Sequence, residues 1–247
     1  MTRSNGHGAL ELAALPCCCS APYSHACLIP PLGHPPEASW RTQCKYNLKQ
    51  IGLALHTYHD DYGSFPPAHI ADSNGRPVHS WRVLLLPYLD QKPLYEKYRF
   101  DEPWDGPNNG KLADEIVAVY NCPSDVHAHD KTSSTMTDYV AIVGPETPWP
   151  GSRATAIRDI KDGTSTTLLV VEVTNSGIHW MEPRDLHVLQ MAQTINAKSG
   201  QGISSRHTCG AHVLMADGSA RFISDQTAAE LIRGLLTVNG KETIGDF

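Results

Sequence analysis

Apolar side chains recur at helical spacing between Trp40 and Tyr62. Steps of three or four residues separate them, which places them on one face of an α-helix. The set is Trp40, Cys44, Leu48, Ile51, Leu55, Tyr58 and Tyr62. Ser39 is placed to cap the start of this helix, and Gly63 is placed to end it. Such an amphipathic helix, roughly 35 Å long, needs a partner surface, so we expect it to lie on a sheet.

The pattern becomes strand-like in the second half of the chain. Segments rich in branched and aromatic residues predict strands at 138–143, 167–174, 211–216 and 220–224. Asp217 and Gly218 separate the last two, and this pair tolerates the positive φ that a tight hairpin requires. A closing helix follows, capped by Asp225 or Ser224 and ending at Leu236.

The remaining segments are predicted to form short helical turns and long loops. Pro87 and Pro93 divide residues 80–100 into two short helical turns. Loops are expected at 66–80, 101–135 and 175–206. Because no strand–helix–strand alternation is present, the elements predict an α+β fold with a small antiparallel sheet.

Composition limits both the organisation and the partners. With 247 residues, 40% of them hydrophobic, the chain can bury one core, which we place at 39–247. Residues 1–38 have no such pattern and hold four of the seven cysteines, so we expect a separate, disordered segment. A net charge of -6 makes nucleic acid an unsuitable partner. No stretch is apolar for long enough to span a membrane, so the sequence predicts neither export nor anchoring.

Several side chains suggest metal chemistry, each with a simpler explanation. His56 and His59 are three residues apart on the predicted helix, but no third ligand is near them in the sequence. Residues 125–130 offer four possible ligands for zinc or nickel. Asp162 and Asp217 each precede a glycine, which is typical of turns, although calcium remains an alternative. We therefore expect no cofactor, and a calcium or zinc site is the alternative.

Catalytic patterns are weak. Ser204 and Ser205 lie near His207, but no Gly-x-Ser-x-Gly elbow is present, so we do not expect an enzyme. Glu172 lies inside an apolar run and needs a partner if it is buried. Arg158 or Arg221 is the expected partner.

A set of short motifs carries a resemblance to a known family. The motifs are Arg41-Thr42-Gln43-Cys44, Asn47-Leu48-Lys49-Gln50-Ile51-Gly52-Leu53-Ala54-Leu55-His56, Ser64-Phe65-Pro66-Pro67, Ser80-Trp81-Arg82-Val83, Leu86-Pro87-Tyr88-Leu89, Cys122-Pro123-Ser124-Asp125, Asp162-Gly163-Thr164-Ser165 and Ala216-Asp217-Gly218-Ser219. In this order they resemble a bacterial envelope family, domain of unknown function 1559 (DUF1559). Its members look like type II secretion pseudopilins, and the resemblance covers about residues 37–247.

The resemblance implies a pilin-like fold and a location in the cell envelope, at the inner membrane or secreted. Family members carry an apolar helix with a prepilin-type methylation signal before the Arg-Thr-Gln-Cys segment, and this sequence does not. Membrane contact is therefore expected only if that helix is restored. Cys209 and His212 also depart from a Gly-Gly-Ala-Asn pattern, which predicts local strain.

The resemblance also bears on function. Cys44 and Cys122 match family positions and would form either a disulfide in an oxidising envelope or two buried free thiols in the cytoplasm. We expect Cys44, Leu48, Ile51 and Leu55 to hold the helix on the sheet. The first hypothesis is a non-enzymatic pseudopilin-like head domain whose partners are other envelope proteins. The alternative is a secreted or periplasmic module that binds a ligand or metal at a site lined by Trp104, Trp149 and Trp180.

Overall fold

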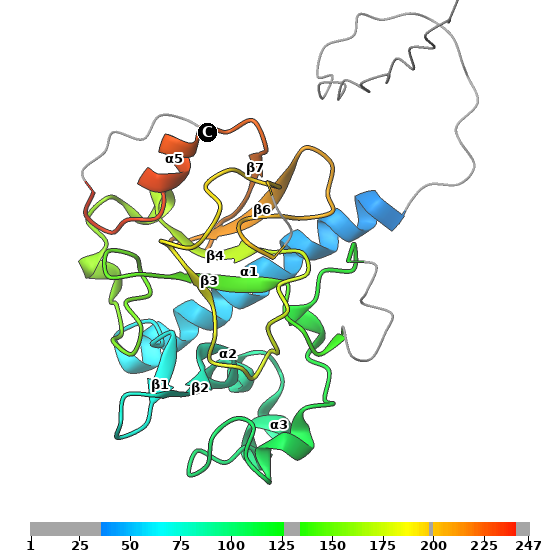
Figure 1. Ribbon diagram of the computed structural model, residues 1–247, viewed down its shortest axis with the longest axis vertical. Helices are drawn as coiled ribbons and strands as arrows, with labels where there is room; N and C mark the ends of the chain where they lie inside the picture. The colour runs from blue at the N-terminus through cyan, green and yellow to red at the C-terminus, as the bar shows by residue number, and fades with distance from the viewer. Residues whose placement is uncertain (1–35, 126–133, 198–199, 241–247) are drawn as a thin grey trace, which may run out of the picture. The chain divides into compact units, whose positions relative to one another are not determined.

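The computed structural model describes residues 36–125, 134–197 and 200–240, and within them the fold is α+β (Figure 1). A five-stranded sheet and a two-stranded sheet are accompanied by helices. Residues 1–35 lie outside the described part, so the predicted disordered segment stays a prediction. Among the described residues, no helix has the length and apolar character needed to cross a membrane.

The first helix, α1 (Pro36–Tyr62), begins earlier than expected. Proline is accepted in a first helical turn because the N–H it lacks would have no partner there. Ser39 therefore lies inside the helix, and its prediction as the cap is wrong. Gly63 ends the helix as predicted, with a φ of 76° and an N–H that donates to the His59 carbonyl at 2.7 Å.

One side of α1 is buried against the large sheet. Cys44, Leu48, Ile51 and Leu55 are each 0% exposed, and α1 contacts strands β6 (Gly210–Met215) and β7 (Ala220–Ser224). The burial stops before the end of the helix, where Tyr62 is 64% exposed.

The large sheet has the order β5-β3-β4-β6-β7. Its other strands are β3 (Tyr139–Val143), β4 (Leu168–Glu172) and β5 (Leu186–His187). All neighbours are antiparallel except β3 and β5, which run parallel. The sheet is therefore mixed, and the prediction of a purely antiparallel sheet is wrong at this pair. A strand of two residues is too short to leave a pattern in the sequence.

The predicted hairpin joins β6 and β7. Gly218 has a φ of 81°, and the Met215 N–H donates to the Ser219 carbonyl at 2.9 Å. The strain expected before β6 is also present, since Cys209 adopts a φ of 67°. A non-glycine residue in that region costs roughly 1–2 kcal/mol.

The closing helix, α5 (Ala229–Gly234), is shorter than predicted. Its N-cap position is Ala228, so the predicted caps are wrong. The Ser224 side chain instead accepts a hydrogen bond from the Gln226 N–H at 3.2 Å, which forms a turn ahead of the helix. Asp225 donates its N–H to the Cys209 carbonyl.

Smaller elements lie between α1 and β3 and between β3 and β4. Helices α2 (Trp81–Leu84) and α3 (Lys92–Lys97) confirm the two short turns. The predicted loop at 66–80 contains an antiparallel pair, β1 (His69–Ala71) and β2 (Pro77–Ser80). Short 3-10 helices span Leu86–Tyr88, Asn109–Leu112, Ala118–Tyr120, Ile157–Asp159 and Thr164–Thr166.

Both faces of the large sheet are covered by apolar side chains. Successive residues of β3 alternate, so Tyr139 belongs to the core on the α1 side and Val140 to the core on the α5 side. Ile232 and Leu235 connect α5 to that second core. At the Glu172 end of β4, polar groups interrupt this packing and form the candidate site.

Candidate functional site

A disulfide between α1 and the loop that precedes β3 forms one wall of the site. Cys44 and Cys122 are bonded, with their Cα atoms 5.2 Å apart, so the structure has the disulfide and not the free thiols. The Cys122 N–H donates to the Asp138 carboxylate at 2.6 Å. This contact fixes the start of the Cys-Pro-Ser-Asp motif against β3.

Glu172 ends β4 and is 1% exposed. Its Oε1 lies 3.3 Å from His207 Nε2, and its Oε2 lies 3.5 Å from His212 Nδ1. The His212 N–H also donates to Oε2 at 3.0 Å, because β6 pairs with β4. The partners of Glu172 are thus two histidines, and the prediction of Arg158 or Arg221 is wrong.

His207 connects the disulfide, α1 and Glu172. Its side chain is 0% exposed, and its Nδ1 lies 2.7 Å from Glu37 Oε1 on the first turn of α1. The Ser124 hydroxyl is 3.3 Å from the same nitrogen. On the other side of the ring, Nε2 lies 3.5 Å from the Cys122 sulfur.

These contacts favour a charged pair at the centre of the site. Burial raises the pKa of Glu172, but the hydrogen bonds from His207 and His212 outweigh it and leave the pKa below its usual value. Burial lowers the pKa of His207, but Glu172 and Glu37 outweigh it and raise the pKa. Burial, together with the nearby carboxylates, raises the pKa of Asp138 well above its usual value.

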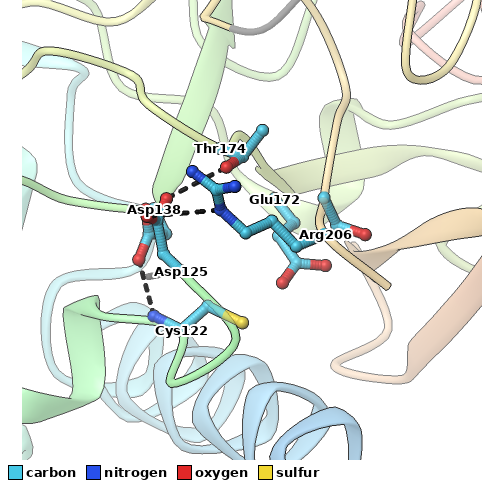
Figure 2. A pocket seen from close by; sticks show the side chains of 7 residues that line it. Cys122, Asp125, Asp138, Glu172, Thr174 and Arg206 are labelled. Carbon is cyan, nitrogen blue, oxygen red and sulfur yellow. Dashed lines mark hydrogen bonds and ion pairs between the residues drawn. The ribbon is translucent and has the colours of Figure 1, made fainter. Parts of the chain in front are cut away.

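A cavity of about 10 Å³ lies beside the pair, and Figure 2 shows the side chains around it. Arg206 closes one side, with its Nε 3.4 Å from the Asp125 carboxylate. Asp125 also accepts a hydrogen bond from the Thr174 hydroxyl at 3.0 Å. A volume of this size holds about one water molecule, so a substrate does not fit in it.

The serines considered for catalysis use their hydroxyl groups in contacts with the backbone. The Ser205 hydroxyl donates to the Gly210 carbonyl and accepts the His207 backbone N–H. The Ser204 hydroxyl donates to the Gly202 carbonyl. Both hydroxyl groups therefore stabilise the loop before β6.

The predicted metal ligands on α1 are separated from this cluster. His56 and His59 both contact Phe65, with ring centroids 5.6 and 5.2 Å from it. His59 Nε2 accepts the Ile157 N–H at 3.2 Å. Residues 126–130 lie outside the described part of the chain.

The predicted calcium positions make turn contacts. Asp217 accepts the Ser219 N–H at 2.8 Å. Asp162 accepts a hydrogen bond from the Thr237 hydroxyl at 2.9 Å and from the Gly240 N–H at 2.6 Å. These contacts use the carboxylates to order backbone turns.

The three tryptophans do not form a common surface. Trp149 and Trp180 are each 1% exposed. Trp149 donates its Nε1–H to the Leu169 carbonyl, and Trp180 donates to the Glu115 carbonyl. Trp104 stacks on His179, with ring centroids 5.5 Å apart. Trp149 and Trp180 therefore cannot contact a ligand from solvent, and the prediction of a site lined by all three tryptophans is wrong for these two.

A groove lies between α1 and the loop that carries Ile116 and Pro123. It encloses about 500 Å³. Its wall on α1 is formed by Trp40, Gln43, Asn47 and Gln50, which lie at helical spacing. The opposite wall includes Ile116, which is 48% exposed. Sequence patterns did not indicate this groove, because its second wall comes from a loop.

A family model described as a protein of unknown function, DUF1559, matches residues 35–185 and 174–230. Together these matches cover most of the chain, including α1, the large sheet and the polar cluster. The chain matches no curated protein and no solved structure.

Proposed function

The chain belongs to the DUF1559 family, and from this premise we propose that it is a non-enzymatic structural subunit. In this proposal it is a pseudopilin-like head domain that packs through α1 into a bacterial envelope assembly, related to type II secretion or pili. Its partners are helices of other copies or of related subunits. The proposal rests chiefly on the open groove along α1.

The surface beside the groove favours a helical partner. Tyr46 and Leu53 are 54% and 71% exposed, and both lie on α1 next to the residues that line the groove. A helix that docks in a groove uses apolar side chains at this spacing as anchors. Large apolar side chains that cluster at the surface of one element mark interaction sites more often than apolar side chains scattered singly over the surface.

Two further observations support the envelope location and the absence of catalysis. The Cys44–Cys122 disulfide is of a kind that persists in oxidising compartments and is rare in the cytosol. The cavity at the polar cluster has room for about one water molecule and not for a substrate. In this proposal the charged pair there therefore stabilises the fold.

Self-association of the full chain tests the proposal. Sedimentation velocity over a range of concentrations should give a dimer or larger species, and Leu53→Asp should weaken it about tenfold or more, since a buried leucine contributes roughly 1.5–3 kcal/mol. Leu189→Asp is the matched control, because Leu189 is 84% exposed and belongs to the segment after β5, not to α1.

Photo-crosslinking in bacterial cells adds the assembly test. A photoreactive amino acid at position 53 should crosslink to another copy or to another DUF1559 chain, and one at position 189 should not. A chain that is monomeric at every concentration and gives equal crosslinking at both positions would contradict the proposal.

A further inference from the structure

Four side chains with metal-binding chemistry meet at the disulfide. The sulfur atoms of Cys44 and Cys122, a carboxylate oxygen of Glu172 and a ring nitrogen of His207 all lie within 4.8 Å of one another, and all four residues are buried. Thiolate, imidazole and carboxylate are the ligands that Zn²⁺ takes in proteins. Among the residues that the structure describes, no other group of three or more such ligands is found.

Two of the distances between ligand atoms fit a tetrahedral ion. Zn²⁺ holds sulfur at about 2.3 Å and nitrogen or oxygen at about 2.0–2.2 Å, so ligand atoms around it are roughly 3.3–3.8 Å apart. His207 Nε2 lies 3.5 Å from the Cys122 sulfur and 3.3 Å from Glu172 Oε1. The two sulfur atoms are closer together only because they are bonded.

The hydrogen-bond partners of these ligands are also arranged as in a metal site. A metal-bound histidine almost always uses its other ring nitrogen to donate to a carboxylate or carbonyl, and His207 Nδ1 lies 2.7 Å from Glu37 Oε1. Glu172 Oε2 accepts the His212 N–H, which orients the carboxylate. Glu172 Oε1 is buried and lies 3.3 Å from His207 Nε2. Nε2 and Oε1 thus lie next to each other, and Nε2 lies beside the Cys122 sulfur.

We propose that reduction of the Cys44–Cys122 disulfide creates a Zn²⁺ site in which the two sulfurs, His207 Nε2 and Glu172 Oε1 are the ligands. A cellular dithiol supplies two electrons and two protons, which break the S–S bond and give two thiols, and the dithiol itself becomes a disulfide. Binding of Zn²⁺ then forms two Zn–S bonds and the bonds to His207 Nε2 and Glu172 Oε1, and it releases the two thiol protons together with the Nε2 proton of the charged His207. The oxidised chain offers only two ligands and does not hold the ion.

Zinc content of the full chain tests the proposal. The chain is reduced with a phosphine, which does not bind zinc strongly, incubated with Zn²⁺ and freed of unbound ion. The reduced wild type should retain one more Zn²⁺ per chain than reduced His207→Ala. The other five cysteines are the same in both proteins, so they do not contribute to the difference. The two oxidised proteins should retain equal amounts.

His212→Asn is the matched control, since it alters a neighbouring buried imidazole that is not a ligand, and it should keep the extra ion. Glu37→Gln should weaken binding roughly 10–100-fold, as loss of an outer partner does. Glu37 is 40% exposed, so this variant still reports on the site if His207→Ala does not fold. Cobalt in place of zinc should give thiolate charge-transfer bands and the intense visible bands of a tetrahedral ion.

Several outcomes overturn the proposal. Equal zinc in reduced wild type and His207→Ala would do so, as would equal zinc in the reduced and oxidised wild type. A cobalt spectrum without thiolate bands would exclude the two cysteines as ligands. If the reduced chain loses its circular dichroism, zinc must restore it; failure to restore it also overturns the proposal.

Discussion

A buried ion pair between Arg82 and Asp185 joins α2 to the segment before β5. The two side chains are 0% and 1% exposed. Asp185 also accepts hydrogen bonds from Trp81 Nε1 and from the Ala141 N–H. The Arg82 Nε donates to the Tyr139 carbonyl at 3.2 Å. Almost every polar atom of the pair therefore has a partner, which is what makes a buried pair tolerable.

Removal of one member of this pair should be costly. Asp185→Ala leaves the Arg82 charge buried without a counter-ion, so we expect the free energy of unfolding to fall by about 3–5 kcal/mol. Urea denaturation measures the loss. Arg76→Ala is the control, because Arg76 pairs with Asp72 at the surface and its loss should cost about 0–1 kcal/mol. Equal losses in the two variants would disprove the role given to burial.

Single residues were predictable where they repeat and were missed where they pair over long distances. Leu48 and Ile51 belong to a periodic set, so their burial follows from spacing alone. The partners of Glu172 and of Arg82 come from distant segments, and no local pattern indicates them. The sequence-based hypothesis gave Glu172 an arginine partner because arginine carries the opposite charge. In the structure, His207 and His212 lie beside Glu172 instead.

At the scale of elements, the disulfide holds α1 to the loop that precedes β3. It closes a loop with a sequence separation of 78. Replacement of both Cys44 and Cys122 by alanine should lower the free energy of unfolding by about 4 kcal/mol, because the unfolded chain regains the entropy of that loop. Denaturant unfolding of the oxidised proteins measures the difference. A loss below about 1 kcal/mol would show that packing of α1, and not the covalent bond, keeps the loop in place.

The hairpin between β6 and β7 offers a test of how closely α1 approaches the sheet. Gly218 has a φ of 81°, and a Cβ there would lie 3.3 Å from the His56 ring on α1. Gly75 has nearly the same φ, 80°, but a Cβ there meets nothing within 4 Å. We expect Gly75→Ala to cost roughly 1–2 kcal/mol from the backbone alone. Gly218→Ala should cost more in thermal or urea unfolding, and equal costs would indicate that His56 moves aside freely.

Elements were predictable in proportion to their length and regularity. α1, β6 and β7 carry long patterns or a recognisable turn, and their predicted positions agree with the structure to within a few residues at each end. The strands β1, β2 and β5 span two to four residues, which is too short for alternation to show. β2 begins at Pro77, and proline is accepted at a first strand position.

At the scale of the whole molecule, the response to acid depends on histidines that are partly buried in their neutral form. Burial lowers the pKa of His69, His79 and His179 below the usual histidine value of about 6.5. A hydrogen bond to the Phe100 carbonyl partly opposes this for His79. The charge of His207 acts in the opposite direction, since the pKa of that residue is raised.

These directions give a pH dependence with a definite sign. As the pH falls through about 6.5, the unfolded chain binds protons that folded His79 resists, so the free energy of unfolding decreases. The variant His79→Gln lacks this contribution. Its free energy of unfolding should therefore decrease less than that of the wild type when the pH falls from about 7.5 to about 5.5. Urea denaturation at each pH measures both proteins. Parallel curves would mean that His79 takes up its proton equally in the folded and unfolded chains, and that its contacts with Tyr98 and Phe100 do not favour the neutral ring.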